Sequence, residues 1–264
     1  MSPRIVQVDA FTDQAFAGNP AAVCILAHAA DKRWMQQVAG EMNLSETAFL
    51  FRQDDAWNLR WFTPTVEVDL CGHATLASAH VLWQDRHLQP GTQALFDTKS
   101  GRLTAERNGD WIEMDFPAEP AHPVEPPEFL LPALGIKAKY VGKNRMDYLV
   151  EVGSETELRT MRPDFTRLRT LPVRGVTVTA PAVEDEFDFV SRFFAPGAGV
   201  DEDPVTGSAH CCLAPYWGAK LGKTEMTGFQ ASSRGGVVRV RTAGDRVILG
   251  GQAVTVLRGE LSPE

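Results

Sequence analysis

The 264-residue sequence has few cysteines and no pattern that would pair them. They are Cys24, Cys71, Cys211 and Cys212, none of which forms a C-x-x-C pair. The adjacent pair, Cys211 and Cys212, is poorly suited to a disulfide, and a chain of this length needs neither a disulfide nor a metal to hold a core. We therefore predict reduced, mostly buried thiols, as is typical of a cytoplasmic protein.

Long apolar runs and an excess of basic residues are also missing. No apolar stretch of about 7–15 residues follows a basic start, so no secretory signal is expected. No uncharged apolar run approaches the ~18 residues that span a bilayer. The formal net charge of −8 disfavours nucleic acid and anionic membranes as partners. We predict a protein that binds neither.

The common cofactor motifs are absent as well. No G-x-G-x-x-G follows a predicted strand, and no G-x-x-x-x-G-K-[ST] occurs, which argues against a nucleotide cofactor. Five residues are of zinc-binding types: Cys71, His73, His210, Cys211 and Cys212. The last three lie in one predicted helix, where neighbouring positions point about 100° apart, and no pair has the usual zinc spacing. We predict no metal.

The chain does contain an internal repeat. Residues 60–64 (RWFTP) resemble residues 192–196 (RFFAP), 132 positions later, and Gly72 and Gly207, 135 positions apart, each open a run of small residues. Two further pairs keep the spacing of 135: residues 99–101 with 234–236, and residues 109–110 with 244–245. Four matches in one order predict two similar halves related by a pseudo-twofold axis.

A proline-rich stretch, residues 117–132, would join the halves, because proline lacks the amide donor and suits a surface crossing. We predict a first half of residues 1–117 and a second half of residues 118–264. The last strand, about 252–264, is also compatible with joining the first half.

Each half is predicted to hold one apolar helix among strands, an α+β fold with a curved sheet or barrel wrapped around a central helix. In the first half, helices are predicted at 34–42, capped by Asp31, and at 74–83, and strands at 5–11, 47–51, 59–62, 103–106 and 111–116. In the second half, a helix is predicted at 208–221, and strands at 148–152, 176–179, 237–241, 247–249 and 252–258.

The two central helices begin at the matching glycines, Gly72 and Gly207. Free amides at a helix N-terminus, together with the helix dipole, bind anions, so a substrate carboxylate is the natural ligand. Either glycine alone is more simply explained by a tight turn. Both at matching positions favour a binding site.

Reactive residue types surround these glycines. Cys71 and His73 flank the first, and acidic residues 201–203 precede the second. Glu46 falls between a polar turn and an apolar strand. The simpler alternatives are helix caps for the acids of 201–203 and a solvated strand-edge acid for Glu46.

Seven segments together resemble a known family: VDAFT (8–12), GNPAAV (18–23), NLSETAF (43–49), RWFTP (60–64), CGHAT (71–75), EDPVTGSA (202–209) and GGQAV (250–254). They resemble the PhzF family of phenazine-biosynthesis-type isomerases and cover nearly the whole chain. The resemblance implies the diaminopimelate-epimerase-like fold, with the active site between two pseudo-symmetric halves. It also implies an enzyme without cofactor or metal, commonly a homodimer.

The resemblance further implies that Glu46 moves a proton from one carbon to another on a carboxylate-bearing ring. Burial is expected to make such a carboxylate a stronger base. The other residues that the resemblance places in the site are His73 and Asp203 as catalytic groups, and Asn19, Gly72, Gly207 and Ser208 as substrate-binding groups. Neither the substrate nor a role in phenazine synthesis is fixed by the sequence.

Two other functions stay open at this stage. One is a non-catalytic protein that binds a small acid in the same cleft. The other is a racemase or epimerase that uses Cys71 with an acid from the second half. A symmetric two-thiol racemase is disfavoured, because the second half offers Asp203 and Pro204, not a cysteine, before its helix.

Overall fold

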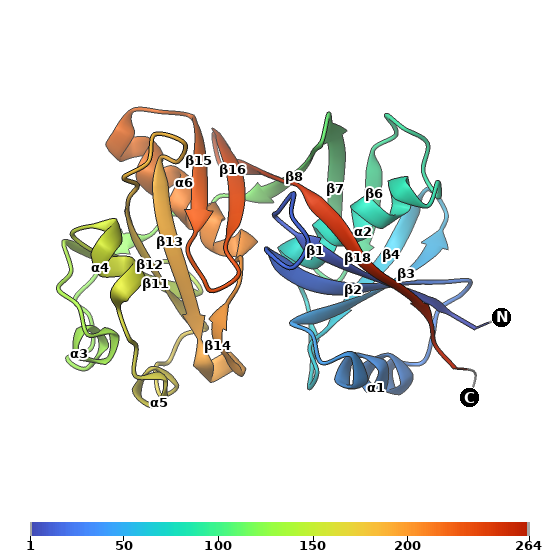
Figure 1. Ribbon diagram of the computed structural model, residues 1–264, viewed down its shortest axis with the longest axis horizontal. Coiled ribbons are helices and arrows are strands. Elements are labelled where there is room, and N and C mark those ends of the chain that lie inside the picture. Colours follow the sequence, from blue (N-terminus) through green and yellow to red (C-terminus); the bar gives the residue numbers. More distant parts are fainter. Residues whose placement is uncertain (1, 263–264) are drawn as a thin grey trace. The chain divides into compact units, whose positions relative to one another are not determined.

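The computed structural model describes residues 2–262, which form two compact units (Figure 1). The first unit consists of residues up to 116 together with the last segment, from residue 250 onward, and the second consists of residues 117–249. The last strand thus belongs to the first unit, so the second unit ends at residue 249 and not at residue 264. Among residues 2–262, none of the helices combines the length and the apolar composition that a transmembrane span requires.

The first unit is a mixed sheet with two helices, α1 (Lys32–Met42) and α2 (Gly72–Gln84). Its strands are β1 (Arg4–Ala10), β2 (Asn19–Leu26), β3 (Glu46–Gln53), β4 (Ala56–Phe62), β5 (Glu67–Val68), β6 (Ala94–Thr98), β7 (Gly101–Asn108), β8 (Trp111–Pro117) and β18 (Ala253–Glu260). Strand β1 pairs antiparallel with both β18 and β2. Parallel pairs join β2 to β3 and β4 to β6, while β3–β4 and β6–β7–β8 are antiparallel.

The second unit has the same kind of sheet around α6 (Gly207–Leu221). Its strands are β9 (His122–Pro123), β10 (Tyr140–Lys143), β11 (Asp147–Glu151), β12 (Gly175–Pro181), β13 (Phe189–Ala195), β14 (Val200–Asp203), β15 (Glu225–Gln230), β16 (Gly236–Ala243) and β17 (Arg246–Gly251). Its short helices are α3 (Leu130–Leu134), α4 (Glu155–Thr160), α5 (Phe165–Leu168) and a 3-10 turn, Pro196–Ala198.

The two units share one topology. The parallel pair β2–β3 corresponds to β11–β12, the antiparallel pair β3–β4 to β12–β13, and the parallel pair β4–β6 to β13–β15. The hairpins β6–β7 and β15–β16 then follow in the same order. The α+β fold of two similar halves, predicted from the repeat, is confirmed.

The central helices are buried because they carry almost no charge. Ten of the thirteen residues of α2 are buried, and so are eight of the fifteen of α6. Both helices begin at the predicted glycines, one or two residues before the predicted starts. Neither glycine has a positive φ, so neither is needed for a left-handed turn. Helix α1 is capped as predicted, with Asp31 Oδ1 accepting from the amides of Arg33 and Trp34.

Candidate active site

Glu46 stands at the first position of β3, directly after the turn that ends α1. That helix stops at Asn43, whose φ of 50° is left-handed, and the chain then enters the strand. The Glu46 side chain is 19% exposed and its Oε2 lies 3.2 Å from Nε2 of His73. Glu46 is therefore not the solvated strand-edge acid of the simpler interpretation.

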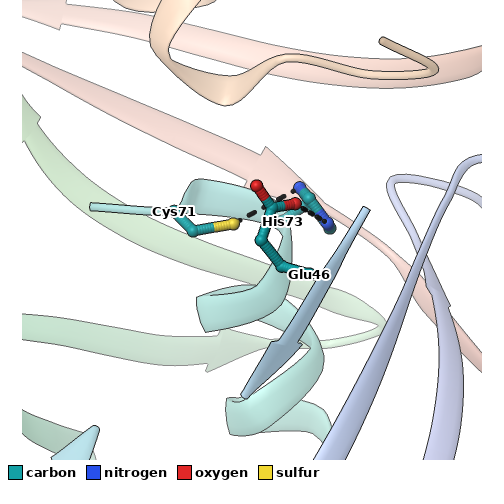
Figure 2. A group of neighbouring side chains, drawn as sticks. All are labelled: Glu46, Cys71 and His73. Carbon is teal, nitrogen blue, oxygen red and sulfur yellow. Dashed lines mark hydrogen bonds and ion pairs between the residues drawn. The ribbon is translucent and has the colours of Figure 1, made fainter. Parts of the chain in front are cut away.

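His73 is the second residue of α2 and makes three polar contacts. Besides Glu46, the Nδ2 of Asn19 lies 3.2 Å and the Sγ of Cys71 3.5 Å from its Nδ1. An amide nitrogen and a thiol can donate, so Nδ1 is the acceptor and the ring proton sits on Nε2, the nitrogen nearer to Glu46. Figure 2 shows Glu46, Cys71 and His73 converging at the start of α2.

Burial lowers the pKa of His73 to about 3, so the ring is neutral at pH 7. The contact between Glu46 and His73 is consequently one between a carboxyl group and a neutral imidazole. Among the described residues, Nε2 has no hydrogen-bond partner of good geometry, so the 3.2 Å contact with Glu46 is a close approach and not a hydrogen bond.

Asn19 is held in place by the glycine before it. Gly18 has a φ of +64°, and a Cβ there would lie 2.2 Å from the backbone oxygen of Ala10, so only glycine fits. Asn19 itself is fully buried at the start of β2. Its contact with Nδ1 orients the His73 ring, which is a positioning role in addition to the substrate-binding role that the resemblance implied.

Three residues here are also of metal-ligating types. The ligand atoms of Glu46, Cys71 and His73 lie within 4.8 Å of one another. Sequence reasoning did not group them, because Glu46 is far from the other two along the chain. The predicted zinc-type residues of α6 are not part of this cluster. The absence of a metal remains a prediction.

The predicted residues of the second unit gather at the start of α6. Asp203 ends β14, Thr206 is the residue before the helix, and Gly207 and Ser208 begin it. The hydroxyl of Thr206 donates to Oδ2 of Asp203. Gly207 is buried and Ser208 is half-buried. The residue of the second unit that corresponds to Cys71 is therefore Thr206, and not Asp203 or Pro204 as inferred from the sequence. The conclusion that the second unit has no cysteine at this position is correct.

An ion pair that the sequence analysis did not identify fixes the strand before each helix. In the first unit, Nε of Arg60 lies 2.8 Å from Oε1 of Glu67. In the second, Nε of Arg192 lies 2.7 Å from Oε1 of Glu202. The arginines are 132 positions apart and the glutamates 135, so the repeated R-x-F motif marks this pair.

The two ion pairs differ in their surroundings. Oε2 of Glu67 also lies 3.1 Å from Nζ of Lys32 and 2.8 Å from Nζ of Lys99. Hydrogen bonding from Arg60, ahead of the contributions of the two lysines, lowers the pKa of Glu67 to about 2.

A cavity of about 280 Å³ opens at the other end of α2, beside His80 and Trp83. Neither Glu46 nor His73 lines this cavity.

Comparisons with known proteins agree with this architecture. Residues 8–259 match the family model described as phenazine biosynthesis-like protein. An uncharacterized isomerase of Halalkalibacterium halodurans is 56% identical over 262 residues, with 99% of each chain covered. A PhzF-family crystal structure from Enterococcus faecalis superposes with a TM-score of 0.95 at 39% identity, covering all of both chains.

A more distant structure shows how widely the fold is used. A probable proline racemase of Agrobacterium radiobacter has a TM-score of 0.65 at 11% identity, covering 100% of this chain and 94% of its own. The match over residues 8–259 and the full-length relatives show that the chain belongs to the PhzC-PhzF family of phenazine biosynthesis-like proteins.

Proposed function

We propose that the protein is an isomerase that moves a proton on a small carboxylate-bearing substrate, with Glu46 as the acid and base. The observation that carries the proposal is the contact of Glu46 with a buried, neutral His73 at the start of α2. Full-length relatives that are named isomerases support the reaction class.

The chemistry follows from these groups. The Glu46 carboxylate takes a proton from one carbon of the substrate, the electron pair delocalises toward a carboxylate or conjugated system, and the proton returns at another carbon. Nothing is oxidised or reduced, so the step needs no electron carrier. The Nε2–H of His73 offers a hydrogen bond to developing negative charge, and the amides that open α2 offer further donors.

Asp203, Gly207 and Ser208 are proposed to bind or protonate the same substrate. The supporting observation is local: both central helices open with a glycine, and Asp203 ends the strand that precedes α6. The homodimer and the cytoplasmic location stay predictions.

The test is exchange of substrate protons for deuterium in D₂O, followed by NMR. A panel of small carboxylates is used, including dihydro-hydroxyanthranilate-type rings and α-amino acids. Wild-type protein should label one class, and Glu46→Gln should lower the exchange rate by about 10²–10⁴-fold, because general acid–base catalysis contributes that much. Glu41→Gln, which neutralises an exposed glutamate of α1, is the matched control and should exchange at the wild-type rate.

The same assay separates the competing functions. Wild-type turnover by Glu46→Gln would assign the proton transfer to another group. The contact of Cys71 with His73 makes a Cys71-dependent racemase the second candidate. In that case Cys71→Ser would abolish exchange and a thiol reagent would inactivate the protein, with protection by substrate. Saturable binding of an acid without any exchange would indicate the non-catalytic binding protein.

A further inference from the structure

A fully buried glutamine stands behind the residues that lead into α6. Gln230 is the last residue of β15 and is 0% exposed. Its Oε1 accepts from the backbone amide of Thr206 at 2.8 Å. Its Nε2 donates to the backbone oxygen of Asp203 at 2.7 Å and to Oγ1 of Thr206 at 3.2 Å. One side chain therefore binds both ends of the segment that joins β14 to α6.

The backbone partners fix which way the Gln230 amide faces. A backbone N–H can only donate and a backbone C=O can only accept, so Oε1 must face the amide of Thr206 and Nε2 must face the carbonyl of Asp203. The same NH₂ group then occupies a lone pair of the Thr206 hydroxyl. That hydroxyl has one proton, and it is directed to Oδ2 of Asp203.

We propose that Gln230 is a positioning residue that acts on Asp203 through Thr206. It fixes the direction of the Thr206 hydroxyl and thereby holds the Asp203 carboxylate in one orientation. This inference rests on the proposed function, because it requires Asp203 to act on the substrate. Sequence analysis did not identify Gln230, because it lies outside every motif and outside every predicted strand.

The decisive variant is Thr206→Val, which removes the hydroxyl, nearly keeps the side-chain shape and leaves both backbone contacts of Gln230 in place. We expect kcat to fall by about 10–100-fold, the range for a hydrogen bond to a charged group, with a smaller change in KM. The acidic limb of the pH profile should move to higher pH, because the carboxylate loses the Thr206 donor that favours its charged form, while the charge of Arg174, which also acts on Asp203, is unchanged. Thr206→Ser keeps the hydroxyl and should restore kcat to within about threefold of wild type on the same scale.

Gln230→Met should change kcat and the pH profile in the same direction as Thr206→Val does. Gln53→Met, which replaces an exposed glutamine of β3, is its matched control. If Gln230→Met does not fold, Thr206→Val still decides. In a protein that already carries Asp203→Asn, Thr206→Val should not lower kcat further, because its effect on kcat depends on the Asp203 carboxylate. A purely structural role would instead give additive losses and an unmoved pH profile.

The outcomes separate the two proposals. If wild type exchanges protons, Glu46→Gln does not, and Thr206→Val keeps the wild-type kcat and pH profile, the role of Gln230 is refuted and the proposed function stands. If wild type exchanges no proton of any compound in the panel, the proposed function fails and this inference falls with it.

Discussion

The two units start their central helices alike but take their carboxylates from different strands. Helix α2 follows Cys71 and opens with a glycine and His73, whereas α6 follows Thr206 and opens with a glycine and a serine. In the first unit the acid is Glu46, at the start of β3. In the second it is Asp203, at the end of the short strand just before the helix.

Strand register shows why the second unit has no counterpart of Glu46. Thr47 lies opposite Phe62 on β4, and Val176 lies opposite Phe194 on β13, the repeated phenylalanine of the R-x-F motif. Gly175 precedes Val176 just as Glu46 precedes Thr47. Gly175 therefore occupies in the second unit the position that Glu46 occupies in the first. A Cβ on Gly175 would lie 2.4 Å from Cζ of Phe193. The two units keep the same strand pairing, but close packing around Gly175 leaves no room for a side chain at the position that Glu46 occupies in the first unit.

The largest expected effect comes from giving Gly175 a side chain. Gly175→Ala places the Cβ against the Phe193 ring and 2.8 Å from the backbone oxygen of Phe194, which cannot swing away. We expect a loss of about 3 kcal/mol in the free energy of unfolding, at the upper end for overpacking. Urea unfolding measures it.

Gly40→Ala is the matched control for that prediction. Gly40 lies inside α1, where its added Cβ would meet nothing closer than the Pro64 oxygen at 3.5 Å. Alanine should leave stability unchanged or raise it by up to about 1 kcal/mol through helix propensity. Equal, small effects of the two substitutions would show that Gly175 is replaceable and that packing does not explain the lost acid.

The sequence predicted the scaffold well because local patterns specify it. Apolar runs with almost no charge predicted α2 and α6, and the predicted starts lie within two residues of the observed ones. The repeated arginines of the R-x-F motif pointed to two similar halves. Their partners, Glu67 and Glu202, were missed because each ion pair depends on a short edge strand that leaves no periodic pattern in the sequence.

Those ion pairs are expected to differ in strength. Arg192 also donates to the backbone oxygens of Leu158 and Met161, both at 3.2 Å, and its side chain is 11% exposed. Arg192→Met should therefore lower the free energy of unfolding by about 2 kcal/mol, because it leaves polar groups unpaired in a partly buried place. Arg60→Met should lower the free energy of unfolding by less than that, because the carboxylate of Glu67 keeps two lysines.

The difference between the two arginine variants is the quantity to measure, by chemical unfolding at low and at high salt. The loss for Arg60→Met should increase with salt, as screening weakens the exposed lysines. A larger loss for Arg60→Met than for Arg192→Met would mean that the lysines do not compensate.

The site was predicted only in part, and the reason is distance along the chain. Glu46 and His73 were named through the resemblance, but no spacing rule places a residue of β3 beside the second residue of α2. Their contact depends on how β3 and α2 pack within the first unit. The tautomer of His73 was equally invisible, because it depends on the buried amide of Asn19.

The two buried histidines beside the helix starts should also differ, in the ring nitrogen that carries the proton. His73 accepts at Nδ1 from Asn19 and carries its proton on Nε2. Nδ1 of His210 lies 2.9 Å from the backbone oxygen of Thr206. That oxygen can only accept, so the proton of the His210 ring sits on Nδ1. Long-range ¹H–¹⁵N NMR should show opposite tautomers. The same tautomer in both would break this contrast between the units and, with it, the assigned orientation of Asn19.

Both rings should stay neutral well below the usual histidine range. Burial lowers the pKa of His73 to about 3 and, against the opposing hydrogen bond to Thr206, that of His210 to about 4. The unfolded chain takes up protons near pH 6.5, so it binds more protons than the folded chain between that value and pH 4. The free energy of unfolding should therefore fall on acidification through this window, by up to about 1.4 kcal/mol per pH unit for each ring. His210→Gln should flatten the dependence by one such contribution, and an unchanged slope would mean that His210 titrates normally in the folded protein.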